Sequence, residues 1–152
     1  MPEAISNTSC IIILDKLGML GVLKELYREI TITDVVRQEF GRETESWIKI
    51  REVKDRKCLN LLQSMIDPGE ASTIALALEI NDPRLILDDD RARKLARSLH
   101  LKFTGTLGVI LKARKRGLIS SVMDTLNQLE AHNFRMSEEL IKKVMKLSGE
   151  TG

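Results

Sequence analysis

The sequence is poor in aromatic residues, proline and cysteine, and it contains no long hydrophobic run. Aromatic residues make up 3% of the 152 residues, with three prolines and two cysteines. This composition excludes collagen-like chains and disulfide-rich secreted domains. No apolar run exceeds five residues, far short of the roughly 20 residues of a membrane-spanning helix. Because the first residues also lack the features of a signal peptide, we expect a cytoplasmic protein with no membrane association.

The net charge is +2, which alone gives no indication of a nucleic-acid partner, but the charge is unevenly distributed. Residues 91–117 contain nine basic residues and no acidic one, whereas the rest of the chain has 15 basic and 22 acidic residues. A local excess of positive charge indicates a polyanionic partner better than the total does. The scarcity of aromatic residues argues against binding dominated by base stacking, so the affinity should depend on salt.

Short apolar runs alternate with amphipathic helical patterns along the chain. We predict strands at residues 4–6, 30–32, 85–87 and 101–103, with helices between them. Residues 42–66 are predicted to be mostly helical, and Thr106 is predicted to cap a helix that ends at Gly117. Two amphipathic helices, 121–132 and 137–147, follow. This alternation predicts an α/β fold whose short parallel sheet has helices on both faces. We expect one domain over 1–152, with 119–150 as a C-terminal helical extension.

Acidic and polar side chains are expected to gather at one edge of this sheet, because ligands of such folds bind beyond the carboxyl ends of the strands. Asn7 follows the first predicted strand and Asp88, Asp89 and Asp90 follow the third. Glu39 belongs to an apolar helix, and Glu70 begins a helix after a Pro-Gly turn. Each of these side chains on its own also fits an ordinary helix cap or a solvated surface position.

The three adjacent aspartates favour a metal site over this ordinary interpretation. Carboxylates packed closely together repel one another unless a cation compensates them. A set of oxygen ligands is typical of Mg²⁺ or Mn²⁺ rather than zinc, and His100 and His132 lack the spacing of metal ligands.

Five short motifs with characteristic spacing follow one another from about residue 5 to residue 118. They are Ser6-Asn7-Thr8-Ser9, Val36 to Glu39, Pro68-Gly69-Glu70-Ala71, Leu85-Ile86-Leu87-Asp88-Asp89 and Gly105-Thr106-Leu107-Gly108. In this order they resemble the PIN-domain family, and most closely its small prokaryotic branch that includes the VapC-like toxins. Each motif is weakly specific alone, whereas the ordered set is fairly specific.

The resemblance implies a three-layer α/β/α fold and a metal-dependent ribonuclease that hydrolyses RNA phosphodiester bonds with Mg²⁺ or Mn²⁺. By position, it implies catalytic and metal-binding roles for Asn7, Glu39, Glu70 and Asp88, with Asp89 replacing or supplementing Asp88. It also implies supporting hydroxyl groups on Ser9, Thr104 and Thr106. The basic segment then becomes the RNA-binding surface, through Arg91, Arg93, Lys94, Arg97 and Lys112; solvated helix faces remain the alternative for these side chains.

Asn7 departs from the family pattern, which has aspartate at this position. A neutral amide oxygen holds Mg²⁺ less tightly than a carboxylate does. The alternative hypothesis is therefore a catalytically weak PIN-like module that binds RNA or a protein. The toxin comparison implies a small antitoxin protein as a partner and is compatible with a homodimer. A phospho-acceptor receiver domain also clusters aspartates at strand ends, but the chain lacks the matching lysine.

Overall fold

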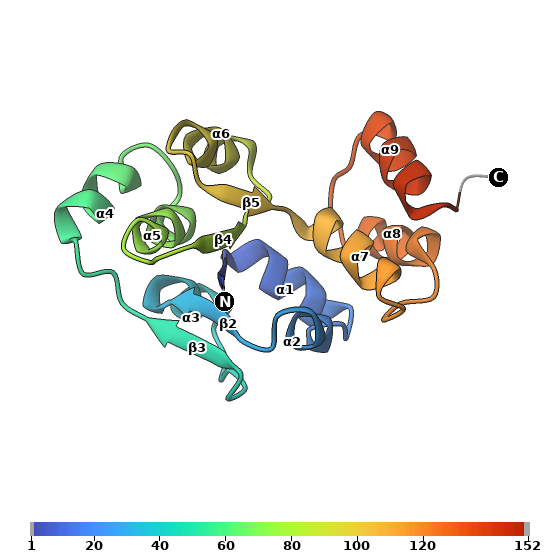
Figure 1. The fold of residues 1–152 in the computed structure, drawn as a ribbon, viewed down its shortest axis with the longest axis horizontal. Helices are drawn as coiled ribbons and strands as arrows, with labels where there is room; N and C mark the ends of the chain where they lie inside the picture. Colours follow the sequence, from blue (N-terminus) through green and yellow to red (C-terminus); the bar gives the residue numbers. More distant parts are fainter. Residues whose placement is uncertain (1, 151–152) are drawn as a thin grey trace.

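A computed structural model describes residues 2–150, in which five short strands and nine helices follow one another (Figure 1). The ends of the predicted domain, residue 1 and residues 151–152, lie outside the described residues. The strands are β1 (Glu3–Ser6), β2 (Ile30–Thr33), β3 (Ile48–Arg51), β4 (Pro83–Ile86) and β5 (Lys102–Thr104). The helices are α1 (Thr8–Lys16), α2 (Gly21–Tyr27), α3 (Asp34–Phe40), α4 (Arg56–Gln63), α5 (Pro68–Ala77), α6 (Asp90–Ser98), α7 (Thr106–Lys115), α8 (Val122–Ala131) and α9 (Glu138–Ser148).

All five strands form one parallel sheet in the order β3-β2-β1-β4-β5. β1 lies at the centre, so the chain builds the sheet outward in both directions. Ser6 is aligned with Ile86, and Ile86 with Thr104. Because the strands are parallel and in register, their carboxyl ends reach the same edge. The α/β fold with a parallel sheet is confirmed.

Successive residues of the adjacent strands β1 and β4 enter two separate cores. Ala4 and Ile86 join the core under α1, α2 and α7, whereas Ile5 and Leu85 join the core under α4, α5 and α6. This alternation follows from the pleat of a strand, which directs successive side chains to opposite faces. Figure 1 shows the resulting three layers, with α4 to α6 on the side of the sheet away from α1 and α2.

α5 is the most deeply buried helix, with eight of its ten residues buried. Its glycine, alanine, serine and threonine side chains are small, so the helix can pack closely against both the sheet and its neighbours. α5 begins at Pro68, a residue suited to the first helical turn because its missing N–H has no partner there in any case. This close packing holds the start of α5, and with it Glu70, firmly at the edge of the sheet.

The last two helices share a core with α7. Leu126 and Leu129 of α8 and Val144 and Met145 of α9 are buried in the same core as α1 and α2. The hydroxyl group of Ser137 caps α9, as predicted, by accepting a hydrogen bond from Leu140 N at 3.1 Å. Within the described residues, no helix combines the length and apolarity needed to span a membrane.

Two predictions about secondary structure are wrong. Residues 42–66 contain β3 as well as α4, because alternating Ile48-Lys49-Ile50-Arg51 pairs with β2 as an edge strand. Thr106 is not an N-cap: Gly105 holds the cap position of α7, and the Thr106 hydroxyl group donates a hydrogen bond to Asp88 instead.

Candidate metal centre

The carboxyl edge of the sheet brings together the segments that carry the acidic residues. One residue separates β1 from α1, none separates β2 from α3, and three separate β4 from α6. α5 packs against α3, α6 and the sheet. Glu39 on α3, Glu70 on α5 and Asp89 before α6 are therefore close in space although they are far apart in the sequence.

Glu39 lies directly on the backbone of Gly69, one residue before Glu70. A methyl group at position 69 would be 2.2 Å from Glu39 Oε1 and 2.9 Å from Thr8 Oγ1. The Thr8 hydroxyl group donates a hydrogen bond to Glu39 Oε1. A side chain at position 69 would therefore displace the Glu39 carboxylate, whose direction is fixed by Thr8.

Glu70 is the most perturbed acidic group of this cluster. Its Oε2 atom is buried and has no hydrogen-bond partner among the described residues. Burial, followed by the neighbouring Asp89 and the charges of Asp67 and Glu39, raises the pKa of the Glu70 carboxyl group to about 8. A buried carboxylate oxygen without a donor is costly, and a cation bound at this atom would remove the cost.

Asp88 and Asp89 face different neighbours. Asp88 accepts hydrogen bonds from Thr106 N at 2.7 Å and from Thr106 Oγ1 at 2.6 Å. Asp89 caps α6 by accepting a hydrogen bond from Ala92 N at 3.0 Å, and it is the aspartate that perturbs Glu70. Of the two aspartates left open by the sequence, Asp89 is thus the one beside Glu70, while Asp88 lies at the start of α7.

Asn7 is buried, and both polar atoms of its side chain have protein partners. Its Oδ1 atom accepts a hydrogen bond from Cys10 N at 3.4 Å and thereby caps α1. Its Nδ2 atom donates to Ser9 Oγ at 3.1 Å. The hydroxyl groups predicted to support the site are separated: Ser9 contacts Asn7, Thr106 contacts Asp88, and Thr104 packs against Gly108.

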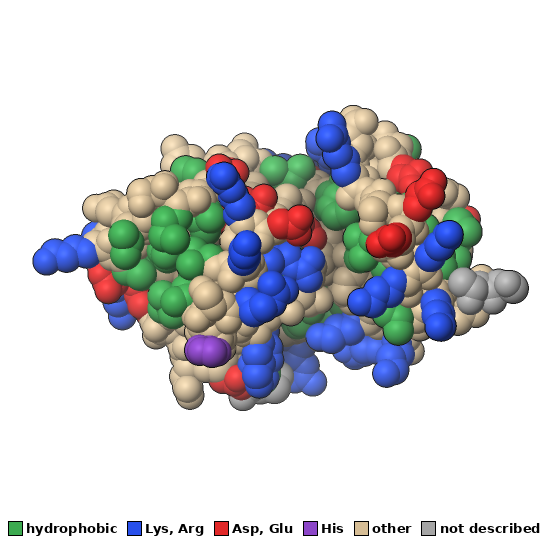
Figure 2. Space-filling model, turned by 90° about the horizontal axis from the view of Figure 1, so that it is seen from above, with side chains coloured by type: hydrophobic (Ala, Val, Ile, Leu, Met, Phe, Trp, Pro, Cys, Tyr) green, Lys and Arg blue, Asp and Glu red, His purple; other side chains and the backbone are tan. Residues whose placement is uncertain are grey.

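The basic residues predicted to bind RNA fall into two groups. Arg93 and Arg97 of α6 lie over the Phe103 ring, at 5.1 and 5.3 Å from its centroid, and Arg91 and Lys94 are exposed on the same helix. Lys112 is on α7, 5.0 Å from the centroid of the Tyr27 ring. Figure 2 shows blue side chains in a band across the middle of this face, next to a small red group.

A chain of buried hydroxyl groups connects the helices that carry Glu39 and Glu70. Thr33 Oγ1 accepts a hydrogen bond from Val36 N at 3.1 Å and lies 2.6 Å from Ser72 Oγ. Ser72 Oγ donates to the Gly69 carbonyl oxygen at 2.8 Å. Since Thr33 caps α3 and Gly69 lies in the first turn of α5, this chain sets the spacing of the two glutamates.

Replacing Thr33 with valine is expected to lower the free energy of unfolding by about 1–2 kcal/mol. The variant loses the cap of α3 and leaves the buried Ser72 hydroxyl group without its partner. Thermal denaturation followed by circular dichroism measures the loss. Thr33→Ser retains the hydroxyl group and should recover most of the stability; a loss in Thr33→Ser as large as that in Thr33→Val would contradict the role assigned to the hydrogen bonds.

Comparison with known proteins identifies the family of this chain. A family model, DUF3368, described as a PIN domain, matches residues 3–150. The chain belongs to the PIN-domain family. A search of curated proteins gives no match. PIN domains are nuclease-type folds that typically use divalent metal ions, and the predicted family is therefore confirmed, although this match says nothing about the toxin branch.

The donor set of this PIN domain fits a hard divalent cation. The side chains around Glu70 offer carboxylate oxygens, which Mg²⁺ and Mn²⁺ prefer, and the unpartnered Glu70 Oε2 atom is buried among them. Within residues 2–150, however, no three acidic, histidine or cysteine side chains are close enough together to hold a metal ion. Glu39 and Asp89 instead accept hydrogen bonds from Thr8 and from Ala92 N.

Three residues of this PIN-domain site were not predicted from the sequence. Thr8 holds Glu39, Gly69 provides the space for it, and Asp67 adds negative charge near Glu70. Thr8 and Gly69 lie inside the motifs that resemble the family, but their roles depend on how α3 lies against α5. Of these three residues, only Asp67 could have been identified from the sequence, because it lies three residues before Glu70.

Proposed function

We propose that this PIN domain is a divalent-metal-dependent endoribonuclease in which Glu39, Glu70 and Asp89 hold the metal ion. The observation that supports the proposal is the buried Glu70 Oε2 atom, which lacks a partner among the described residues and lies among other carboxylates. These three residues come from three separate segments at the carboxyl edge of the sheet. When bound, Mg²⁺ or Mn²⁺ supplies Lewis acidity that activates water and offsets charge developing on the phosphate.

Each surrounding residue has a role that follows from its contacts. To hold the ion, Glu39 would turn away from its hydrogen bond with Thr8, and Glu70 would need to be ionised, which its raised pKa opposes at neutral pH. Asp88, held by Thr106, completes the acidic surface. A methyl group added at position 105 would lie next to Asp88 and 3.6 Å from the Arg93 guanidinium group. Arg93 is therefore near Asp88, where it can orient a phosphate of the substrate.

A groove beside Asp88 provides room for an RNA strand. Its volume is about 550 Å³, and it runs from Asp88 and Arg93 past Gly105 to Phe134 and Arg135, between α7 and α9. The small Gly105 keeps the groove open at the acidic end. Arginine side chains on its walls match the negative charge of the RNA backbone, and Phe134 offers a ring for one base.

The proposal is tested by incubating a labelled single-stranded RNA with the purified protein in Mg²⁺, Mn²⁺ or EDTA. Cleavage should require the divalent ion and should fall more than about 100-fold in Glu39→Gln and Asp89→Asn. Glu25→Gln, an exposed glutamate on α2, is the matched control. Cleavage that is the same in EDTA, or in the site variants and the control, would contradict the metal assignment.

Asn7→Asp is expected to tighten Mn²⁺ binding about tenfold and to raise cleavage, because it adds a negative charge at the carboxyl edge of the sheet. A carboxylate can still accept the hydrogen bond from Cys10 N that caps α1. Isothermal titration calorimetry with Mn²⁺ measures the affinity, and Asn60→Asp on the exposed face of α4 is the control. Weaker Mn²⁺ binding in Asn7→Asp would contradict the prediction.

The second candidate function is a binding module without nuclease activity. The observation that favours it is that both polar atoms of the Asn7 side chain are used within the protein. RNA binding without cleavage in any divalent ion, together with activity in Asn7→Asp, would support this candidate over the nuclease.

We further propose a toxin-like role in the cytoplasm, with a small antitoxin protein as partner and a homodimer as the assembly. The two cysteines are free thiols, as is usual in a reducing compartment. Expression of the chain alone should arrest growth and expression of Glu70→Gln should not. Light scattering of the purified protein measures its oligomeric state.

A further inference from the structure

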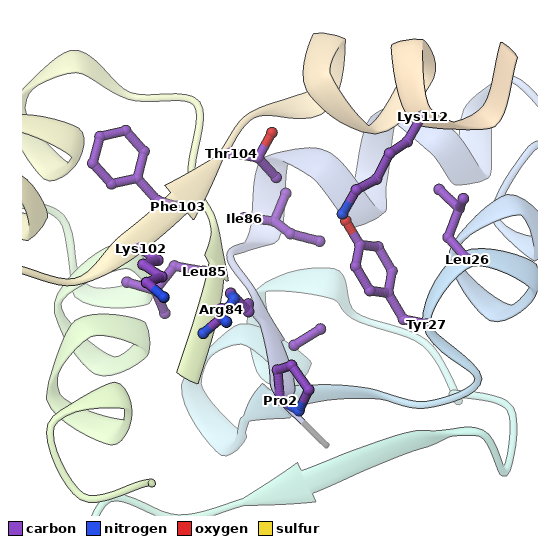
Figure 3. Close-up of a pocket in the computed structure, with 11 residues that line it drawn as sticks. Pro2, Leu26, Tyr27, Arg84, Leu85, Ile86, Lys102, Phe103, Thr104 and Lys112 are labelled. Atoms are coloured by element: carbon purple, nitrogen blue, oxygen red, sulfur yellow. The ribbon is translucent and has the colours of Figure 1, made fainter. Parts of the chain in front are cut away.

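A second cavity lies away from the acidic residues, between α2, α7 and the face of the sheet. Its volume is about 370 Å³, within the range of small-molecule sites. Ala4, Leu26 and Ile86 form its apolar lining, and Tyr27 stands at one side. Figure 3 shows that Tyr27 and Lys112 point toward each other on the side of the cavity opposite the β-strands. Phe103 points away from the cavity, to the other side of β5.

Three basic side chains line this cavity. Arg84 and Lys102 are aligned partners on β4 and β5, so both emerge on the same face of the sheet, and Lys112 reaches in from α7. Like charges directly opposite each other on neighbouring strands are destabilising. Arg84 has an ion pair with Asp82 at 2.5 Å, but in the described part of the chain no carboxylate lies within 4 Å of Lys102 or Lys112. This arrangement favours binding of an anion.

The cavity also offers a surface for a flat apolar group. Tyr27, the only tyrosine of the chain, is partly buried with its ring toward Lys112, and Leu26 and Ile86 lie beside it. Basic groups together with an aromatic ring and an apolar floor are the combination that binds a phosphate and its attached base.

We propose that this cavity binds a nucleoside phosphate, with the phosphate group at Arg84 and Lys102 and the base against Tyr27 and Ile86. Two sources have this chemistry: a free mononucleotide, or one nucleotide of an RNA strand whose scissile bond is at the acidic residues. The second source rests on the proposed nuclease function. Thr104 lines both this cavity and the groove at Asp88. An RNA strand that passes over β5, which is about 10 Å long, would therefore connect the two.

The single tyrosine allows a direct test. Protein labelled with 3-fluorotyrosine should show one ¹⁹F resonance from Tyr27. Titration with AMP, with inorganic phosphate and with a short single-stranded RNA, all in EDTA, should shift it in a saturable way, with AMP binding more tightly than phosphate. In Arg84→Gln/Lys102→Gln the affinity should fall about tenfold or more. Lys54→Gln/Lys57→Gln, which removes two exposed charges near α4, is the matched control.

The outcomes separate this proposal from the nuclease proposal, since the titration requires no metal ion and no cleavage. If the RNA binds more tightly than AMP and this binding is lost in the double variant, the cavity holds one nucleotide of an RNA strand that continues from the acidic site. Tighter binding of AMP supports a free nucleotide. The proposal is overturned if no ligand shifts the resonance, if phosphate and AMP bind equally, or if the double variant and the control titrate alike. Lys112→Gln provides the same readout should the double variant be unfolded.

Discussion

Glu70→Gln is expected to make the metal-free protein more stable while it removes metal binding and RNA cleavage. In the folded protein, burial and the carboxylates around it raise the pKa of Glu70 to about 8. Folding at neutral pH must therefore either protonate this carboxyl group or bury its charge, and both cost free energy that a neutral glutamine does not incur. For this half-buried group, with allowance for solvent screening, the gain is about 2 kcal/mol, or about 4–8 °C in Tm.

The gain should depend on pH in a defined direction. A carboxyl group whose pKa is raised on folding binds its proton more tightly in the folded state. The wild-type protein therefore loses stability as the pH rises from the unfolded value, 4.5, to about 8, whereas Glu70→Gln does not. Melting curves should nearly coincide at pH 5 and differ most at pH 8–9. A difference that is constant over this range would contradict the assigned pKa.

Metal ions should reverse the order of stability. Adding Mn²⁺ stabilises only a protein that binds it in the folded state, so the Tm of the wild type should rise at pH 8 and that of Glu70→Gln should not. The exposed Glu25→Gln serves as the control, and its Tm should follow the wild type with and without Mn²⁺.

Gly69→Ala is expected to impair the metal site without replacing any ligand. The new methyl group would lie 2.2 Å from Glu39 Oε1, so the Glu39 carboxylate must move from its present position. Mn²⁺ affinity should fall about 10–100-fold, as it does when groups that position metal ligands are changed, and cleavage should fall with it. Alanine is otherwise favourable within a helix, so α5 and the fold should be retained.

Two further variants separate this effect from a general one. Gly21→Ala also places alanine in a helix, but no atom lies within 4 Å of its new methyl group, so its activity should equal that of the wild type. Gly69→Ala/Glu39→Asp shortens the displaced side chain and should recover part of the Mn²⁺ affinity. If Gly69→Ala binds Mn²⁺ as tightly as Gly21→Ala does, Glu39 is not part of the site.

The sequence predicts the fold better than it predicts the details of the site. The buried run before Asp88 and the alternation of strands with helices were sufficient for a parallel sheet, because both patterns reflect burial on two faces. β3 was missed since Ile48-Lys49-Ile50-Arg51 is a short edge strand with only Ile48 buried, and its charges resemble those of the helical residues that follow.

The sequence also predicts which acidic residues meet, but not how they are oriented. The carboxyl-edge rule places Asn7 and the aspartates at one edge, and the family resemblance adds Glu39 and Glu70, irrespective of side-chain direction. That Asp88 turns toward Thr106 and Asp89 toward Glu70 depends on where α7 and α6 begin, and α7 begins one residue earlier than predicted. The contact of Glu39 with Gly69 depends on the packing of α3 against α5, which no local pattern encodes.

The central claim is that carboxylates from three separate segments form one divalent-metal site. Electron paramagnetic resonance tests it directly, because bound Mn²⁺ loses the sharp signal of the free ion. The account predicts saturable Mn²⁺ binding at pH 8 that is lost in Glu39→Gln, Glu70→Gln and Asp89→Asn and retained in Glu25→Gln. Equal Mn²⁺ binding by all four variants, or no binding by the wild-type protein, would contradict it.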